Sequence, residues 1–309
     1  MRSRTHFLTT AALAVGALLA LSACSSGGGP FDSTSTSASS RESVTVGSAA
    51  FGESEILMQI YGQALAAHGV SVAYKPSIGQ REAYLAALKD GSINLVPEYT
   101  GNLLQFYAPS STVSSSTEVF AALQKALPKG MTVLNQSAAQ DADSYNVTKA
   151  FSQKWGVTSL DQLGRVTIPL TVAANPEFAT RPYGIPGLKS VYGVTATLKP
   201  ISDSGGPLTV SALVNGDVQL ADIFTTSPAI KDNNLVTLSD PKHLIVAQNV
   251  VPLISSASDT ATVRRVLNAV SARLTTADLI QMNGEYSGAQ KLQPNVIAKR
   301  WLEAHPLSF

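Results

Sequence analysis

Reactive side chains are scarce in this chain of 309 residues, which contains one cysteine and four histidines. A single cysteine cannot form an intramolecular disulfide, and the histidines at positions 6, 68, 243 and 305 show no spacing typical of a metal site. The sequence also has no GxSxG, GxGxxG, HExxH or Walker phosphate-binding motif. We therefore expect no disulfide, no metal and no cofactor, and the enzyme classes that depend on these motifs are excluded.

An excess of charge of either sign is absent as well. Lysine and arginine number 22 and aspartate and glutamate number 21, which gives a formal net charge of +1. Residues 1–23 contain Arg2 and Arg4 and no acidic residue, so the remainder of the chain carries 1 − 2 = −1. Because there is no basic cluster, nucleic acid is not expected as a partner.

One apolar run, residues 7–21, stands at the N-terminus between two arginines and the sequence "LSAC" that ends at Cys24. It is shorter than the roughly 20 apolar residues of a membrane-spanning helix, and the layout is that of an export signal. "LSAC" resembles the bacterial lipobox, which implies cleavage before Cys24 and attachment of diacylglycerol to its sulfur. We predict a signal peptide at 1–23, a flexible lipidated tether at 24–43, and a protein anchored to the outer face of the bacterial plasma membrane.

Strand and helix patterns alternate along residues 44–140. A period-2 strand pattern at 44–47 precedes helical spacing up to Gly69, and a second strand pattern follows at 70–75. Such a unit favours a mostly parallel sheet with helices on its faces. Further elements are expected as a helix at Arg81–Lys89, a strand at 93–96, a helix that opens near Glu98, a helix from about Thr117 and a strand at 131–134.

A second alternating series occupies residues 141–248, with strands near Tyr145, at 166–173 and at 218–224, and a helix within 208–214. Helical spacing alone follows, at 260–286 and 294–305. The two series predict an α/β fold of two lobes with a ligand cleft between them. Lobe 1 is expected to contain 44–140 plus 249–309 and lobe 2 to contain 141–248, so the chain crosses between the lobes at two hinges.

The stretch "NLVPEYTGN", residues 94–102, places Tyr99 directly after a strand pattern. Ligands of α/β architectures bind in crevices beyond the carboxyl ends of the strands. Tyr99 is therefore predicted to face the cleft, whereas the other tyrosines outside the motifs, Tyr183 among them, are expected to be core or surface residues.

Six blocks between about Val44 and about Leu302 are similar to those of the osmoprotectant-binding proteins of ABC importers, the receptors for glycine betaine, choline and carnitine. In order, they are "GSAAFGESEIL", "SINLVPEYTGN", "DADSYNVTKAFSQKWGVTSLDQL", "PEFATR", "GDVQLADIFTT" and "DPKHLIVAQNVVPLI". The resemblance implies a periplasmic-binding-protein fold of type II. It also implies a receptor that captures a small solute and delivers it to a membrane permease driven by a cytoplasmic ATPase. We expect a monomer.

In this family, aromatic rings from both lobes surround a quaternary ammonium, and basic or hydroxyl groups hold its carboxylate. The resemblance places cage tyrosines on Tyr99 and Tyr145, with Asp143 beside the latter. It places the carboxylate-binding arginine on Arg181, with Glu177 as its neighbour. Because Glu177 and Arg181 are four residues apart, they could instead form a solvated helical ion pair.

The resemblance is incomplete at four positions. The third cage tyrosine corresponds to Phe224, which keeps the ring, and the fourth corresponds to Gln248, which has none. Ala49 stands in place of a lysine and Asn102 in place of a threonine. The cage is therefore expected to hold a cation less strongly than is usual in the family.

Two ligand classes remain open for this site. One is a betaine or choline-like cation bound by the rings of Tyr99, Tyr145 and Phe224. The other is a neutral polyhydroxylated or aromatic solute that stacks on the same rings and hydrogen-bonds Gln248, Asn102 and Arg181. The alternatives of a different class are a lipid-anchored hydrolase with Asp143 and Glu177 as a carboxylate pair, and a purely structural lipoprotein.

The first prediction concerns the anchor. Cys24→Ala should release the protein from membranes or leave its signal uncleaved, because the acylated sulfur is the only predicted attachment. Fractionation of cells that express the wild type or the variant tests this. A variant that is still lipidated and membrane-bound would contradict the lipoprotein prediction.

Overall fold

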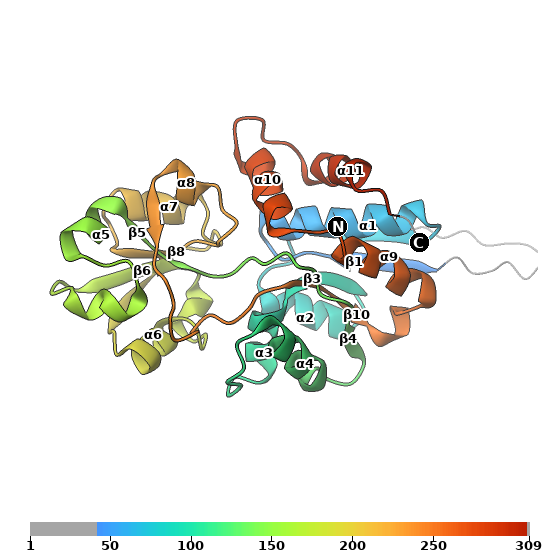
Figure 1. Ribbon diagram of the computed structural model, residues 1–309. Coiled ribbons are helices and arrows are strands. Elements are labelled where there is room, and N and C mark those ends of the chain that lie inside the picture. Colours follow the sequence, from blue (N-terminus) through green and yellow to red (C-terminus); the bar gives the residue numbers. More distant parts are fainter. Residues whose placement is uncertain (1–41, 308–309) are drawn as a thin grey trace, which may run out of the picture. The chain divides into compact units, whose positions relative to one another are not determined.

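The structure is a computed structural model that describes residues 42–307. The predicted signal peptide, Cys24 and most of the predicted tether lie outside these residues, and the first strand begins at Ser43, the last residue of that tether. The described part has a mixed α/β architecture with two five-stranded sheets (Figure 1), as the sequence pattern predicts. Within it, none of the helices has the combined length and apolarity of a membrane crossing.

The first sheet has the strand order β2-β1-β3-β10-β4. The strands are β1 (Ser43–Gly47), β2 (Ser71–Lys75), β3 (Leu95–Tyr99), β4 (Met131–Val133) and β10 (Val250–Ser255). β1 runs parallel to β2 and β3, whereas β10 is antiparallel to β3 and β4. The helices of this part are α1 (Gly52–Ala67), α2 (Arg81–Lys89), α3 (Thr100–Tyr107), α4 (Ser116–Ala126), η3 (Ser256–Ser258), α9 (Ala261–Ser271), α10 (Thr276–Ser287) and α11 (Pro294–Ala304).

The second sheet has the order β7-β6-β8-β5-β9. The strands are β5 (Tyr145–Thr148), β6 (Leu170–Ala174), β7 (Ala196–Pro200), β8 (Leu220–Asp222) and β9 (Leu235–Thr237). β6 is parallel to β7 and β8, and β5 is antiparallel to β8 and β9. Its helices are α5 (Lys149–Trp155), η1 (Leu160–Arg165), η2 (Pro176–Ala179), α6 (Ile185–Tyr192), α7 (Pro207–Val214) and α8 (Ala229–Asp232).

β3 is the strand that carries the site residues of the first sheet, and all five of its residues are buried. Because side chains alternate along a strand, Leu95 packs into the apolar cluster that contains α1, while Val96 packs into the cluster formed by α2, α3 and α4. The expected helix near Glu98 begins instead at Thr100, because β3 continues to Tyr99, which pairs with Val250 of β10.

The chain passes between the sheets along two segments that lie side by side (Figure 1). Gln140 and Asn249 form an antiparallel bridge, the amide of Asp141 donates to the carbonyl of Gln248 (3.2 Å), and that of Val250 donates to Ala139 (2.9 Å). The residues that follow β4 and those that precede β10 are thus held together by backbone hydrogen bonds. Asp141 and Asp143, which lie just after this bridge, are thereby brought next to the end of β3.

The second prediction concerns Gly101, in the first turn of α3. A Cβ there would lie 2.5 Å from Val246 Cγ2, 2.6 Å from the carbonyl oxygen of Ala247 and 2.8 Å from Gln248 Nε2. Gly101→Ala should lower the free energy of unfolding by about 1–3 kcal/mol, because α3 must move away from residues 246–248. Gly284→Ala is the matched control, since a Cβ in that helix meets open space and alanine favours helix. Urea denaturation that ranks the two variants equally would contradict the predicted contact.

Candidate functional site

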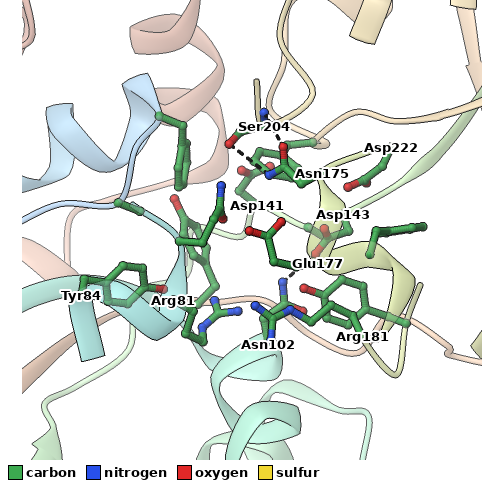
Figure 2. A pocket seen from close by; sticks show the side chains of 18 of the residues that line it. Arg81, Tyr84, Asn102, Asp141, Asp143, Asn175, Glu177, Arg181, Ser204 and Asp222 are labelled. Atoms are coloured by element: carbon green, nitrogen blue, oxygen red, sulfur yellow. Dashed lines mark hydrogen bonds between the residues drawn. The ribbon is translucent and has the colours of Figure 1, made fainter. Parts of the chain in front are cut away.

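A cavity of about 80 Å³ is lined by residues from the segments of both sheets. Its volume is several times the space that one water molecule needs. The lining contains six of the eight predicted ligand-binding residues: Tyr99, Asn102, Asp143, Glu177, Arg181 and Phe224. The structure places Tyr145 and Gln248 outside the lining. Figure 2 shows the polar side chains that project toward the cavity.

Three aromatic rings form a continuous group in this lining. Tyr99 is the last residue of β3, Phe224 lies two residues beyond β8, and Phe51 precedes the first turn of α1. The Phe51 ring centroid lies 6.2 Å from that of Tyr99 and 5.6 Å from that of Phe224. The sequence motifs did not indicate Phe51 as a site residue, although it lies shortly beyond the end of β1, and its place near a strand end is the signal that would have found it.

Tyr145 lies behind the lining, with 1% of its surface exposed. Its hydroxyl donates to the carbonyl oxygens of Tyr183 (2.9 Å) and Gly184 (3.2 Å), and its ring packs edge-on against Phe178 with centroids 5.5 Å apart. Tyr183, which was expected to be a core or surface residue, belongs to a buried apolar cluster of the second sheet and also lines the cavity. Tyr145 therefore supports the backbone that presents Tyr183.

Gln248 is fully buried and holds Asn102. Gln248 Nε2 donates to Asn102 Oδ1 (2.6 Å), and the Asn102 backbone amide donates to Gln248 Oε1 (2.9 Å). Asn102 Nδ2 in turn donates to Asp143 Oδ2 (2.6 Å). The amide of Gln248 is thus consumed in orienting Asn102, and it is Asn102 that reaches the cavity.

Glu98 is a carboxylate with no exposed surface, and it organises the β3 side of the cavity. Arg81 donates to both of its oxygens, through Nε (2.8 Å) and Nη2 (2.9 Å). The Tyr84 hydroxyl (2.7 Å) and the backbone amide of Tyr99 (2.9 Å) complete the set of donors. Burial alone would lower the pKa of Arg81, but the charge of Glu98, its hydrogen bonds and the neighbouring Tyr84 and Tyr183 together hold that pKa above its ordinary value. Arg81 and Tyr84 both line the cavity.

Arg181 does not pair with Glu177, as the helical ion-pair interpretation would require. Its Nη1 and Nη2 lie 2.8 and 3.0 Å from the two carboxylate oxygens of Glu82, and its guanidinium lies 5.8 Å from the ring centroid of Phe106. Glu177 follows β6 in the short turn η2, so its carboxylate points elsewhere. Its Oε2 is buried and has no hydrogen-bond partner among the described residues.

Glu53, in the first turn of α1, joins three separate segments behind the rings. Its carboxylate accepts hydrogen bonds from the Tyr99 hydroxyl (2.6 Å), the Thr226 hydroxyl (2.7 Å) and Asn283 Nδ2 (2.6 Å). Asp141 lies beside it and accepts from the backbone amide of Thr226 (3.0 Å). The orientation of the Tyr99 ring therefore depends on a residue that also contacts the segment after β8.

The acidic groups around the cavity are arranged in two coupled pairs. Burial raises the pKa of Asp141 well above its ordinary value, and the charge of Glu53 raises it further. Burial and the charge of Asp143 do the same to the pKa of Asp222. Asp141 and Asp222 therefore keep a proton to higher pH than free aspartate. Burial also raises the pKa of Glu53 and Asp143, although the hydrogen bonds that these two accept offset part of the rise.

The sequence matches one protein-family model, the substrate-binding domain of ABC-type glycine betaine transport systems, over residues 42–304. The chain belongs to this family. The match covers both sheets and every residue of the cavity lining. Members of the family are solute-binding transport proteins, which agrees with a site composed of rings and hydrogen-bonding groups on a small cavity.

Individual relatives of this substrate-binding domain are distant. The glycine-betaine-binding protein of Pseudomonas aeruginosa is 25% identical over 226 residues, which cover 69% of this chain and 71% of the relative. Among solved structures, a glycine betaine/carnitine/choline ABC transporter protein superposes with a TM-score of 0.67 at 19% identity, covering 85% of this chain and 98% of the other. Lactococcal OpuAC in its closed-liganded conformation superposes with a TM-score of 0.61 at 14% identity, with 85% and 96% covered. The predicted two-lobed α/β binding-protein fold is confirmed.

The third prediction concerns the pH dependence of the stability of this substrate-binding domain. Between the ordinary pKa of Asp222 and its raised value in the folded state, the folded protein binds more protons than the unfolded chain, so the free energy of unfolding falls as pH rises. Asp222→Asn should flatten this fall, since asparagine keeps an acceptor for the Ser144 amide and a donor in place of the acidic proton. The total fall in the free energy of unfolding is about 1.4 kcal/mol for each unit by which the pKa is raised.

Urea denaturation at several pH values between about 5 and 8 measures the effect. Asp217→Asn is the control, because that side chain is 55% exposed and pairs only with an exposed lysine. Equal slopes for wild type and Asp222→Asn would show that Asp222 does not retain its proton.

Proposed function

We propose that the protein is an extracytoplasmic receptor that captures a small solute with a quaternary ammonium, such as glycine betaine or choline, in this cavity. The observation that carries the proposal is the group of rings of Phe51, Tyr99 and Phe224 on a small cavity that also exposes Asp143 and Glu177. A quaternary ammonium cannot donate a hydrogen bond, so it is held by π faces, each contributing about 0.5–2 kcal/mol, and by negative charge.

The solutes of similar proteins support this choice. The Pseudomonas relative is a glycine-betaine-binding protein, and the lactococcal structure holds glycine betaine. A choline-binding protein of an ABC transporter, solved with choline, has the same fold with a TM-score of 0.63 at 12% identity. Both solutes carry a trimethylammonium group of the size that three rings can enclose.

The receptor would work by closure of two lobes, which we propose to be 44–140 plus 249–309 and 141–248. The strands of the first sheet all lie in the former and those of the second sheet in the latter, which supports this division. Polar links join the two: Thr226 with Glu53, Asn102 with Asp143, and Arg181 with Glu82. Closure around a solute would form these links, and release would break them.

Delivery to a permease completes the proposed function. We propose that the acylated Cys24 and the predicted tether keep a monomeric receptor beside an ABC permease driven by a cytoplasmic ATPase. The apolar run that ends in "LSAC" and the family of the chain support this arrangement.

A second candidate solute, neutral and hydroxylated, is favoured by one observation. Glu177 Oε2 is a buried acceptor without a partner among the described residues, and a trimethylammonium group has no hydrogen to give it. A hydroxyl group would satisfy this oxygen. Choline and a neutral polyol or phenol both offer one, so they belong in the same binding assay as glycine betaine.

The fourth prediction uses Phe51, whose side chain contributes a ring and no hydrogen bond. Phe51→Leu keeps the apolar bulk and removes the π face, so it should weaken binding of glycine betaine and choline by about 0.5–2 kcal/mol, or roughly 2- to 30-fold. Phe120→Leu is the control, because Phe120 lies in α4, packs partly buried against the apolar core and is not part of the lining. Isothermal titration calorimetry measures both. If phenols and polyols bind while glycine betaine and choline do not, the second candidate replaces the first.

A further inference from the structure

The two ends of the cavity differ in chemical character. Phe51, Phe224, Asp141 and Ser204 also line a neighbouring groove of about 310 Å³, which places them at one end. Asn102, Arg181 and Tyr183 line a different groove and mark the other end. Figure 2 shows the guanidinium groups of Arg81 and Arg181 near Asn102, with Asp141, Asn175 and Ser204 across the pocket. Phe51 and Phe224 thus stand at one end with Asp141, and the two arginines stand at the other end with Asn102.

The two arginines differ in how far their donors are already engaged. Arg181 directs both terminal nitrogens to Glu82, whose side chain is 54% exposed. Arg81 is 9% exposed and binds the buried Glu98 through Nε and Nη2. Its Nη1 has no hydrogen-bond partner among residues 42–307, although the residue lines the cavity. A guanidinium nitrogen without a protein acceptor on a residue that lines the cavity is available to bind a solute oxygen.

We propose that Arg81 is a specificity-determining residue whose Nη1 binds a carboxylate oxygen of the solute. This rests on the proposed function, because it assumes that the cation occupies the rings at the other end. The preferred solute is then a small zwitterion, with its ammonium at Phe51, Tyr99 and Phe224 and its carboxylate at Arg81. The role that the family resemblance assigned to Arg181 belongs to Arg81, and Arg181 serves as a link to Glu82.

The surroundings of Arg81 suit this role. Glu98 accepts hydrogen bonds from Nε and Nη2, which form one edge of the guanidinium. Glu98 is itself fixed by Tyr84 and the backbone of β3, so Nη1 is held in place before the solute arrives. Binding then costs little side-chain ordering. A charged donor also forms stronger hydrogen bonds than a neutral one. Lysine could not do both tasks, because its single nitrogen would be drawn to Glu98.

The test compares two solutes that share the trimethylammonium group and differ in the carboxylate. Arg81→Lys keeps the positive charge beside Glu98 and removes Nη1. Titration calorimetry should show that it weakens glycine betaine by roughly 10- to 100-fold and choline by less than about threefold. Arg300→Lys, a surface change on α11 at a side chain 55% exposed, is the matched control and should alter neither affinity.

The possible outcomes separate this proposal from the function on which it rests. If wild type binds both solutes and Arg81→Lys weakens them equally, Arg81 does not read the carboxylate, although the receptor function stands. If wild type binds neither solute, the proposed function is wrong and the role of Arg81 falls with it. Should Arg81→Lys fail to fold, wild type decides: glycine betaine must bind at least roughly tenfold more tightly than choline, and equal affinities would overturn the proposal.

Discussion

A fully buried carboxylate needs hydrogen-bond donors on every side, and Glu98 imposes that requirement on the centre of the site. Arg81 and Tyr84 from α2 and the backbone amide of Tyr99 supply them. Because Glu98 has no exposed surface, water could not replace a donor that was removed. This single requirement fixes α2 against the end of β3, and it holds in place two of the cavity-lining side chains as well as the backbone of Tyr99.

The links between the two sheets are of a different kind from the packing within each of them. The buried apolar clusters each draw almost entirely on the segments of one sheet. The connections across the cavity are polar side-chain contacts such as Asn102 with Asp143 and Thr226 with Glu53. Polar contacts exchange readily with water, whereas core packing does not. Separation of the sheets would therefore leave both cores intact, which is the property that a closing receptor requires.

The acidic groups explain how a cavity can be electronegative and still fold. Four buried carboxyl groups, Glu53, Asp141, Asp143 and Asp222, would repel one another if all were charged. Burial and mutual repulsion raise the pKa of Asp141 and Asp222, so these two carboxyl groups keep a proton to higher pH than free aspartate. Burial also raises the pKa of Glu53 and Asp143, and hydrogen bonds from several segments partly offset this rise. Retained protons and hydrogen bonds thus lower the cost of burying four carboxyl groups beside one cavity.

Local pattern was enough for the secondary structure and for the residues at strand ends. Helical spacing predicted α2 with its observed bounds, because periodicity reports which side of an element is buried. The strand predicted at 93–96 was found, but β3 continues to Tyr99 through its pairing with β10. The six motif residues that do line the cavity, Phe224 and Arg181 among them, follow or precede such elements closely. Sequence alone also determined the family and the two alternating series, since both depend on order along the chain.

Only the tertiary structure decided which side chains reach the cavity and which stand behind it. Gln248 and Tyr145 occupy motif positions, yet neither lines the cavity. The side-chain amide of Gln248 is hydrogen-bonded to Asn102, and the hydroxyl of Tyr145 donates to backbone carbonyls. Arg81 belongs to no sequence pattern that indicates a ligand. Arg81 becomes important because Glu98, seventeen residues away, leaves one of its donors free. Such roles depend on hydrogen-bond partners brought together across the fold, and spacing along the sequence carries no information about which donors remain unused.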